Sequence, residues 1–179
     1  QEGGEEGRQG CQARVELEKY VATAPASVPG QTMLGTVLDL QGKKNEAKVR
    51  YNTALQIDPR AAVAANNLAW IDATTEGGNL DVALQLAQTA KGQLPNQHEV
   101  DDTLGWIYYK KGMAARAIEA FENSTLKAPT NASYAYHLGL AYYKNGDTAK
   151  AKTELERALK LKPDFDGAAD AKKVLESIK

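Results

Sequence analysis

The chain has 179 residues, of which 42% are hydrophobic and 25% are charged, a composition typical of folded proteins and unlike that of disordered ones. Lysine plus arginine (22) nearly balances aspartate plus glutamate (23), which excludes the basic field expected of a nucleic-acid-binding protein. No apolar run approaches the roughly 20 residues needed to cross a bilayer, so we expect no direct membrane insertion. The single cysteine, Cys11, cannot form an internal disulfide. The compartment therefore stays open: we expect a soluble protein, cytoplasmic or, in a bacterium, periplasmic.

The first 27 residues divide into two segments. Residues 1–10 hold four glycines and three glutamates and almost nothing apolar, which predicts a flexible lead-in. Residues 11–27 carry apolar residues at helical spacing, which predicts the second helix (helix B) of an incomplete preceding repeat. Its stripe of Leu17, Tyr20 and Val21 should lack the helix that would cover it. We therefore expect this N-terminal end to pair with upstream repeats or with a second copy, as a homodimer.

Two helix-turn-helix repeats follow, over residues 28–61 and 62–97. In the first, small residues at Gly35 and Ala47 allow the two predicted helices to approach closely. The second repeat is two residues longer than the first, because its turn contains an insertion over residues 75–79. Loops tolerate such changes in length, so a harmless insertion is one interpretation and a loop that contacts a partner is the other.

The C-terminal half shows the repetition most clearly. The stretch that begins Leu104-Gly105-Trp106 returns 34 residues later, beginning at Leu138, so residues 98–131 and 132–165 are predicted to be the third and fourth repeats. Residues 166–179 then form an amphipathic pattern. We expect a capping helix there, with a polar outer face that ends the stack.

A Leu-Gly-x2-Tyr stretch, then Ala-x3-Phe, then proline resembles the pattern of the tetratricopeptide repeat (TPR) family. Proline recurs at the expected end of each helix B, at positions 25, 59, 95, 129 and 163. The resemblance implies an all-α fold, a right-handed α-solenoid of TPR helix-turn-helix repeats with a C-terminal capping helix. It also implies a concave face lined by the first helix (helix A) of each repeat. At the level of subfamily, the sequence of repeats three and four is similar to the sequences of bacterial TPR proteins from envelope and exopolysaccharide-export systems.

The sequence offers little that could perform catalysis. His98 and His137 have no histidine or cysteine at ligand spacing, so we expect no metal and no cofactor. The adjacent pair Asp101 and Asp102 points in two directions if it lies on a helix, and neighbouring carboxylates then cannot readily share a substrate. Phosphate-binding loops and dinucleotide fingerprints are absent from the sequence. The chain is therefore predicted not to be an enzyme.

The TPR resemblance also implies where a partner would bind. In this family, ligands commonly lie along helix A residues that face away from the Leu-Gly-Tyr packing side. On this sequence the corresponding positions are rich in aromatic residues and amides: Asn66, Asn67, Trp70, Asp102, Trp106, Tyr109, Tyr136 and Tyr143. Tryptophan and tyrosine are enriched where binding energy concentrates. The alternative is that these rings pack between neighbouring A helices.

One well-known TPR ligand is excluded by the same comparison. TPR proteins that bind the acidic C-terminal tails of Hsp70 and Hsp90 use a clamp of lysines, asparagines and an arginine. At the matching positions this chain keeps Asn67, but it has threonines and Glu99 where cations are needed. We expect no binding to an Hsp70 or Hsp90 tail.

The function predicted from the sequence is a non-enzymatic scaffold that binds a segment of a protein or peptide partner in an aromatic-lined concave groove. Two alternatives stay open. One is an architectural or self-associating segment of a longer TPR array. The other is a carbohydrate-binding groove, because aromatic rings can stack on sugars.

Overall fold

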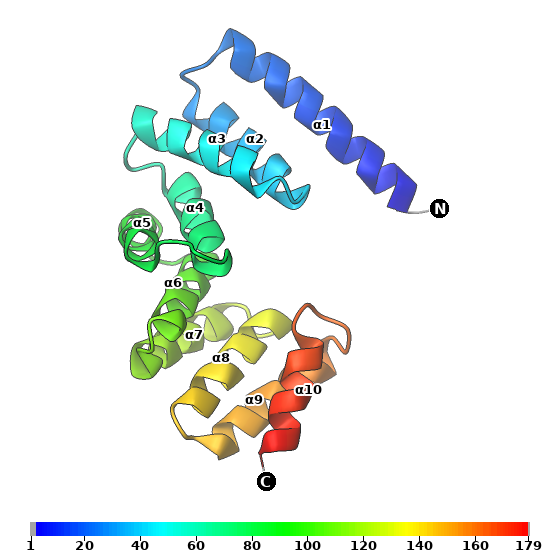
Figure 1. Cartoon of the computed structure of the whole chain (residues 1–179), viewed down its shortest axis with the longest axis vertical. Coiled ribbons are helices and arrows are strands. Elements are labelled where there is room, and N and C mark those ends of the chain that lie inside the picture. Colours follow the sequence, from blue (N-terminus) through cyan, green and yellow to red (C-terminus); the bar gives the residue numbers. More distant parts are fainter. Residues whose placement is uncertain (1–2, 179) are drawn as a thin grey trace. The chain divides into compact units, whose positions relative to one another are not determined.

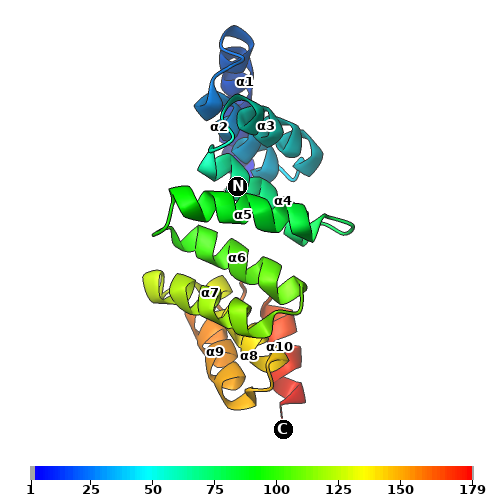
Figure 2. The same ribbon diagram turned by 90° about the vertical axis from the view of Figure 1, so that its left-hand side faces the viewer.

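A computed structural model describes the backbone of residues 3–178 and the side chains of residues 10–178. Within that span the secondary structure is entirely helical, and the chain forms two compact units, residues 1–93 and 94–179 (Figure 1; Figure 2). The helices of the first unit are α1 (Gly3–Thr23), α2 (Val28–Leu40), α3 (Lys44–Ile57), α4 (Ala62–Thr74) and α5 (Leu80–Gln93). Those of the second are α6 (His98–Lys110), α7 (Ala114–Lys127), α8 (Ala132–Lys144), α9 (Thr148–Leu161) and α10 (Ala168–Ser177).

Antiparallel helical hairpins are the building blocks of both units. The hairpins are α2–α3, α4–α5, α6–α7 and α8–α9, and they lie within the residue ranges expected for the four repeats. The second helix of each hairpin ends two residues before a proline of the ladder, because proline disfavours helical geometry in the residue that precedes it. We propose that each hairpin is one repeat and that α10 is the capping helix.

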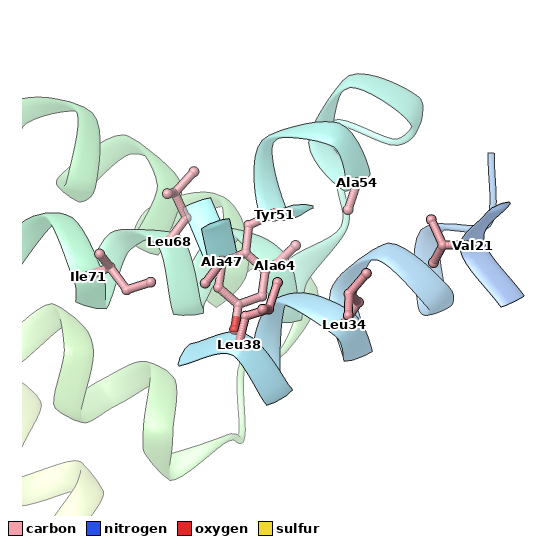
Figure 3. Packing of buried hydrophobic residues seen from close by; sticks show 9 residues of the cluster. All are labelled: Val21, Leu34, Leu38, Ala47, Tyr51, Ala54, Ala64, Leu68 and Ile71. Atoms are coloured by element: carbon pink, nitrogen blue, oxygen red, sulfur yellow. The ribbon is translucent and has the colours of Figure 1, made fainter. Parts of the chain in front are cut away.

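The core of unit 1 lies between α1, α2, α3 and α4. Its buried members come from all four helices: Val21, Leu34, Leu38, Ala47, Tyr51, Ala54, Ala64, Leu68 and Ile71 (Figure 3). Gly35 is essential to this packing. A Cβ added there would lie 2.6 Å from Cε1 of Tyr51, whose side chain is fully buried. The Leu-Gly pair therefore keeps its glycine because an aromatic ring of the next helix occupies the space of a side chain.

The N-terminal segment differs from the expectation in two respects. First, the predicted flexible lead-in is wrong from residue 3 onward, because α1 begins at Gly3; residues 1 and 2 lie outside the described residues. Glutamate, glutamine and arginine favour helices, and continuity with the following helix outweighs the cost of the glycines. Second, the apolar stripe is largely covered. Val21 is buried and Leu17 is partly buried against the unit 1 core, whereas Tyr20 stays half exposed.

Unit 2 repeats this plan with two contiguous buried clusters. One is centred on Phe121 between α6, α7 and α8, and the other on Leu155 between α8, α9 and α10. Helix α10 packs against α9 and buries Ala168 and Ala171. It thus covers the apolar side of the last hairpin, as a capping helix does.

Candidate functional site

The predicted site residues of unit 1 lie together on α4. Asn66, Asn67 and Trp70 are all partly exposed. The Asn67 amide nitrogen donates hydrogen bonds to the hydroxyl of Tyr51, at 3.2 Å, and to Oγ1 of Thr36, at 3.4 Å. Asn67 therefore links α4 to both α2 and α3, and its main role in the free protein is to hold these helices in register.

Asn66 is held less firmly than Asn67. Its amide nitrogen donates to Oδ1 of Asn67 at 3.5 Å, the outer limit of a hydrogen bond. Its Oδ1 atom is buried and has no hydrogen-bond partner among residues 3–178. A buried acceptor without a donor costs about 1–3 kcal/mol. Asn66 thus has an unused hydrogen-bond acceptor on α4, three residues after Val63.

An apolar groove of about 350 Å³ lies between the N-terminal halves of α2 and α4, and we call it the α2–α4 groove. Its lining is uncharged throughout: Val28, Pro29, Thr32, Met33, Ala61, Ala62, Val63 and Ala64. Two of its apolar side chains are more than half exposed, Met33 at 57% and Val63 at 51%. Val63 precedes Asn66 by three residues, so these two side chains are neighbours on the surface of α4.

The α2 half of this groove was missed in the sequence analysis, which placed binding on aromatic and amide side chains. A signal for it is present. Pro29 and Met33 stand four residues apart on α2, and Leu40 follows seven residues after Met33, at 83% exposure. Apolar residues at this spacing form a stripe along one helix face, and this stripe faces away from the buried core.

In unit 2 the predicted site residue Asp102 is buried rather than open. Its Oδ1 atom lies 2.8 Å from Nδ1 of His137, which is one repeat later on α8, and both side chains are almost fully covered. The rings of Trp106 and His137 have centroids 4.7 Å apart, and Tyr109 stacks on Trp106 at 5.3 Å. These contacts join α6 to α8, so the alternative of rings that pack between A helices describes this part of unit 2.

The two remaining tyrosines contact the capping helix. The Tyr136 hydroxyl donates to Oδ2 of Asp170 at 2.7 Å, and the Tyr143 hydroxyl lies 3.0 Å from Oγ of Ser177. Burial and the hydrogen bond to Asp170 raise the pKa of Tyr136 well above its ordinary value. Tyr136 is buried, whereas Tyr143 keeps 39% exposure. The polar atoms of both tyrosines are therefore engaged within the chain.

The structure thus brings the predicted residues together in two separate sets. Asn66, Asn67 and Trp70 form the first set, in unit 1, beside the α2–α4 groove. The second set, Asp102, Trp106, Tyr109, Tyr136 and Tyr143, is in unit 2, where most of its members are held by internal contacts. Among the residues that the structure describes, no cluster of three or more His, Cys, Asp or Glu side chains is placed to hold a metal ion.

Replacement of Trp106 by alanine tests whether this side chain is held by internal packing in unit 2. Because its ring packs against both buried clusters of unit 2, we expect Trp106→Ala to lower the free energy of unfolding by about 3 kcal/mol. Leu126→Ala on α7 removes a side chain that is 81% exposed and should change stability by about 0.5 kcal/mol at most. Urea denaturation followed by circular dichroism measures both. Equal stability of the two variants would show that Trp106 faces solvent.

Comparison with known proteins agrees with this architecture. The tetratricopeptide repeat family model matches residues 132–165, the α8–α9 hairpin. The general transcriptional corepressor ssn6 of Schizosaccharomyces pombe is 25% identical over 135 residues, which span 74% of this chain and 12% of that protein. The crystal structure of the APC/C hetero-tetramer Cut9–Hcn1 aligns with a TM-score of 0.80 at 19% identity, over 96% of this chain and 33% of that one. The TPR protein YrrB aligns with a TM-score of 0.69 at 22% identity, over 94% and 86% of the two chains.

The resemblance found in the sequence is therefore confirmed: the chain carries a tetratricopeptide repeat and has the all-α fold of TPR proteins. Proteins of this fold generally mediate protein–protein interactions. The match spans about an eighth of ssn6 and a third of the Cut9–Hcn1 chain, so it shows a shared fold and assigns none of the activities of those larger proteins. No helix in the part of the chain that the structure describes is long and apolar enough to span a membrane.

Proposed function

We propose that this chain is a non-enzymatic interaction module that binds a segment of a partner protein on the surface formed by α2 and α4. The single observation that carries the proposal is the α2–α4 groove, an uncharged hollow with exposed apolar side chains beside an under-used amide. Water solvates such a surface poorly, and exposed apolar patches mark sites where another protein docks.

Trp70 supplies the second element of the proposed surface. It lies one helical turn beyond Asn66 on α4 and is partly exposed. A partner segment that leaves the groove along α4 would pass Asn66 and then meet the indole ring. Truncation of a central interfacial tryptophan typically costs about 2 kcal/mol or more of binding free energy, and tryptophan is among the residues most enriched at such positions.

Two further considerations support a peptide as the ligand. YrrB, which shares the fold, is a TPR protein with an unusual peptide-binding site. The groove lining provides no cation to pair with a carboxylate, so the segment we propose differs from an acidic Hsp70 or Hsp90 tail. In unit 2, Trp106, Tyr109 and Tyr143 are the predicted residues that keep accessible surface for a partner.

Self-association through the N-terminal end is the second candidate. It is favoured by Val15 and Tyr20 on α1, which are 41% and 50% exposed. Sedimentation of wild type against Tyr20→Ala separates this role from peptide binding. A dimer that depends on Tyr20 would support the architectural function, and a strict monomer at high concentration would remove it.

A peptide-display experiment tests the main proposal. Peptides selected from a random library on the full chain should bind Trp70→Ala about thirtyfold more weakly than wild type. Ile57→Ala, a partly exposed position on α3 in the same unit, is the matched control and should leave affinity unchanged. The proposal fails if no peptide is selected, or if selected peptides bind Trp70→Ala as tightly as wild type.

A further inference from the structure

The lining, the volume and the polar neighbour of the α2–α4 groove together indicate the kind of side chain that it binds. We propose that it holds an uncharged aliphatic side chain of the partner segment, such as leucine, whose neighbouring backbone N–H donates to the Asn66 side chain. This inference rests on the proposed function and narrows it from any peptide to one with an aliphatic anchor.

The charge of the lining selects the kind of side chain. All eight lining residues are uncharged, and seven of them are apolar. A lysine, arginine, aspartate or glutamate side chain that entered would lose hydration without gaining an opposite charge, which is strongly unfavourable. An aliphatic side chain instead gains about 25 cal/mol for each Å² of apolar surface removed from water. The groove therefore favours an aliphatic anchor over a charged one.

The volume of the groove agrees with an anchor of this kind. A cavity of about 150 Å³ accommodates a benzene-sized molecule. At about 350 Å³ the α2–α4 groove has room for one large aliphatic side chain together with part of the backbone that carries it. The exposed side chains of Met33 on α2 and Val63 on α4 can contact the anchor from both sides.

Asn66 supplies the polar contact that such an anchor requires. The backbone N–H next to a buried side chain loses its water and needs an acceptor. Asn66 stands three residues after Val63 on α4, just outside the groove lining, and its Oδ1 atom is a buried acceptor without a partner among the described residues, so the amide must rotate to reach a ligand in the groove. The amide nitrogen of Asn66 makes only the 3.5 Å contact with Asn67. Rotation of the amide toward the groove therefore breaks only this weak hydrogen bond.

Three small probes test the anchor on the full chain: N-acetyl-leucine methylamide, N-acetyl-lysine methylamide, and N-acetyl-leucine methyl ester, which lacks the C-terminal N–H. Titrations are followed by the methyl NMR signals of Val28, Met33 and Val63. We expect the leucine amide to shift these signals and to bind at least about tenfold more tightly than the lysine amide. We expect the ester to bind several-fold more weakly than the leucine amide, and Asn66→Ala to remove this difference.

Val63→Asp is the decisive variant, because it places a carboxylate in the groove at a position that is half exposed and tolerates substitution. It should abolish the shifts caused by the leucine amide. Val82→Asp, on α5 at 42% exposure, is the matched control and should bind as wild type does.

Each other outcome overturns the inference in a recognisable way. If the lysine and leucine amides bind with equal affinity, the proposal of an aliphatic anchor is refuted. Library-selected peptides that lose affinity in Trp70→Ala but not in Val63→Asp leave the proposed function intact and refute the anchor alone. A wild-type dimer that Val63→Asp abolishes shows that a second copy of the chain occupies the groove.

Discussion

Phe121→Ala should lower the free energy of unfolding by about 3–5 kcal/mol, one of the largest effects expected of a single core substitution in this chain. Phe121 is fully buried at the centre of a cluster that joins α6, α7 and α8. Its ring lies in contact with the place where Gly105 lacks a side chain, and its centroid is 5.5 Å from that of His137. Removal of the ring leaves a cavity in this cluster, and the cost of the cavity adds to the lost apolar burial.

Thermal and urea denaturation measure this effect. For a chain of this size, a loss of about 3–5 kcal/mol corresponds to a fall in Tm of roughly 6–20 °C. Leu126→Ala, five residues further along the same helix, is the control and should leave Tm within about 2 °C of wild type. A similar Tm for the two variants would contradict the packing of α6 and α8 around Phe121.

Gly78→Ala should destabilise the protein by about 2 kcal/mol or more, because the turn between α4 and α5 leaves no room for a side chain. A Cβ on residue 78 would lie 1.9 Å from the carbonyl oxygen of Asp72. That oxygen belongs to the backbone of α4, so no rotamer change can relieve the clash. The side chain of Asp72 is also paired with Lys48 on α3, at 2.5 Å, which keeps the end of α4 in place. The two-residue insertion of the second repeat is thus compactly folded against α4.

Gly92→Ala is the matched control for this prediction. Gly92 lies within α5, and an added Cβ there meets no other atom within 4 Å. Alanine is the better helix former, so this variant should gain about 0.5–1 kcal/mol. Differential scanning calorimetry of the two variants should therefore give shifts of opposite sign. A Tm of Gly78→Ala equal to or above that of wild type would mean that the insertion rearranges to accept a side chain.

The repeat period was sufficient to predict most of the fold from the sequence. Period and proline spacing place the helices, because each hairpin must bury its apolar stripe against the next one. The Leu-Gly pairs indicate where helices approach closely, as the contact of Gly35 with Tyr51 shows. The start of α1 differs from the prediction because the helical tendency of glutamate, glutamine and arginine outweighs the flexibility that the glycines indicate.

The candidate site was harder to predict from the sequence than the fold. The same side chains could either bind a ligand or contact one another, and the sequence pattern does not distinguish these two roles. Asp102 pairs with His137, Tyr136 with Asp170, and Tyr143 with Ser177, and each pair is 34 or 35 residues apart. Within unit 2, residues one repeat apart thus lie side by side on α6 and α8 and on α8 and α10. A search for complementary side chains at the repeat period would therefore have identified these internal contacts in advance. The α2–α4 groove depends on the spacing between two helices, which the sequence pattern of a single helix does not specify.

The central claim is that α2 and α4 form the surface that binds a partner segment, and NMR mapping of a library-selected peptide tests it most directly. Amide and methyl shifts of the full chain would be recorded on titration with that peptide. The account predicts that the large shifts fall on the groove residues Val28, Thr32, Met33 and Val63 and on the neighbouring Asn66, and that they disappear in Val63→Asp. Large shifts on α3 and α5, with α2 and α4 unaffected, would contradict it.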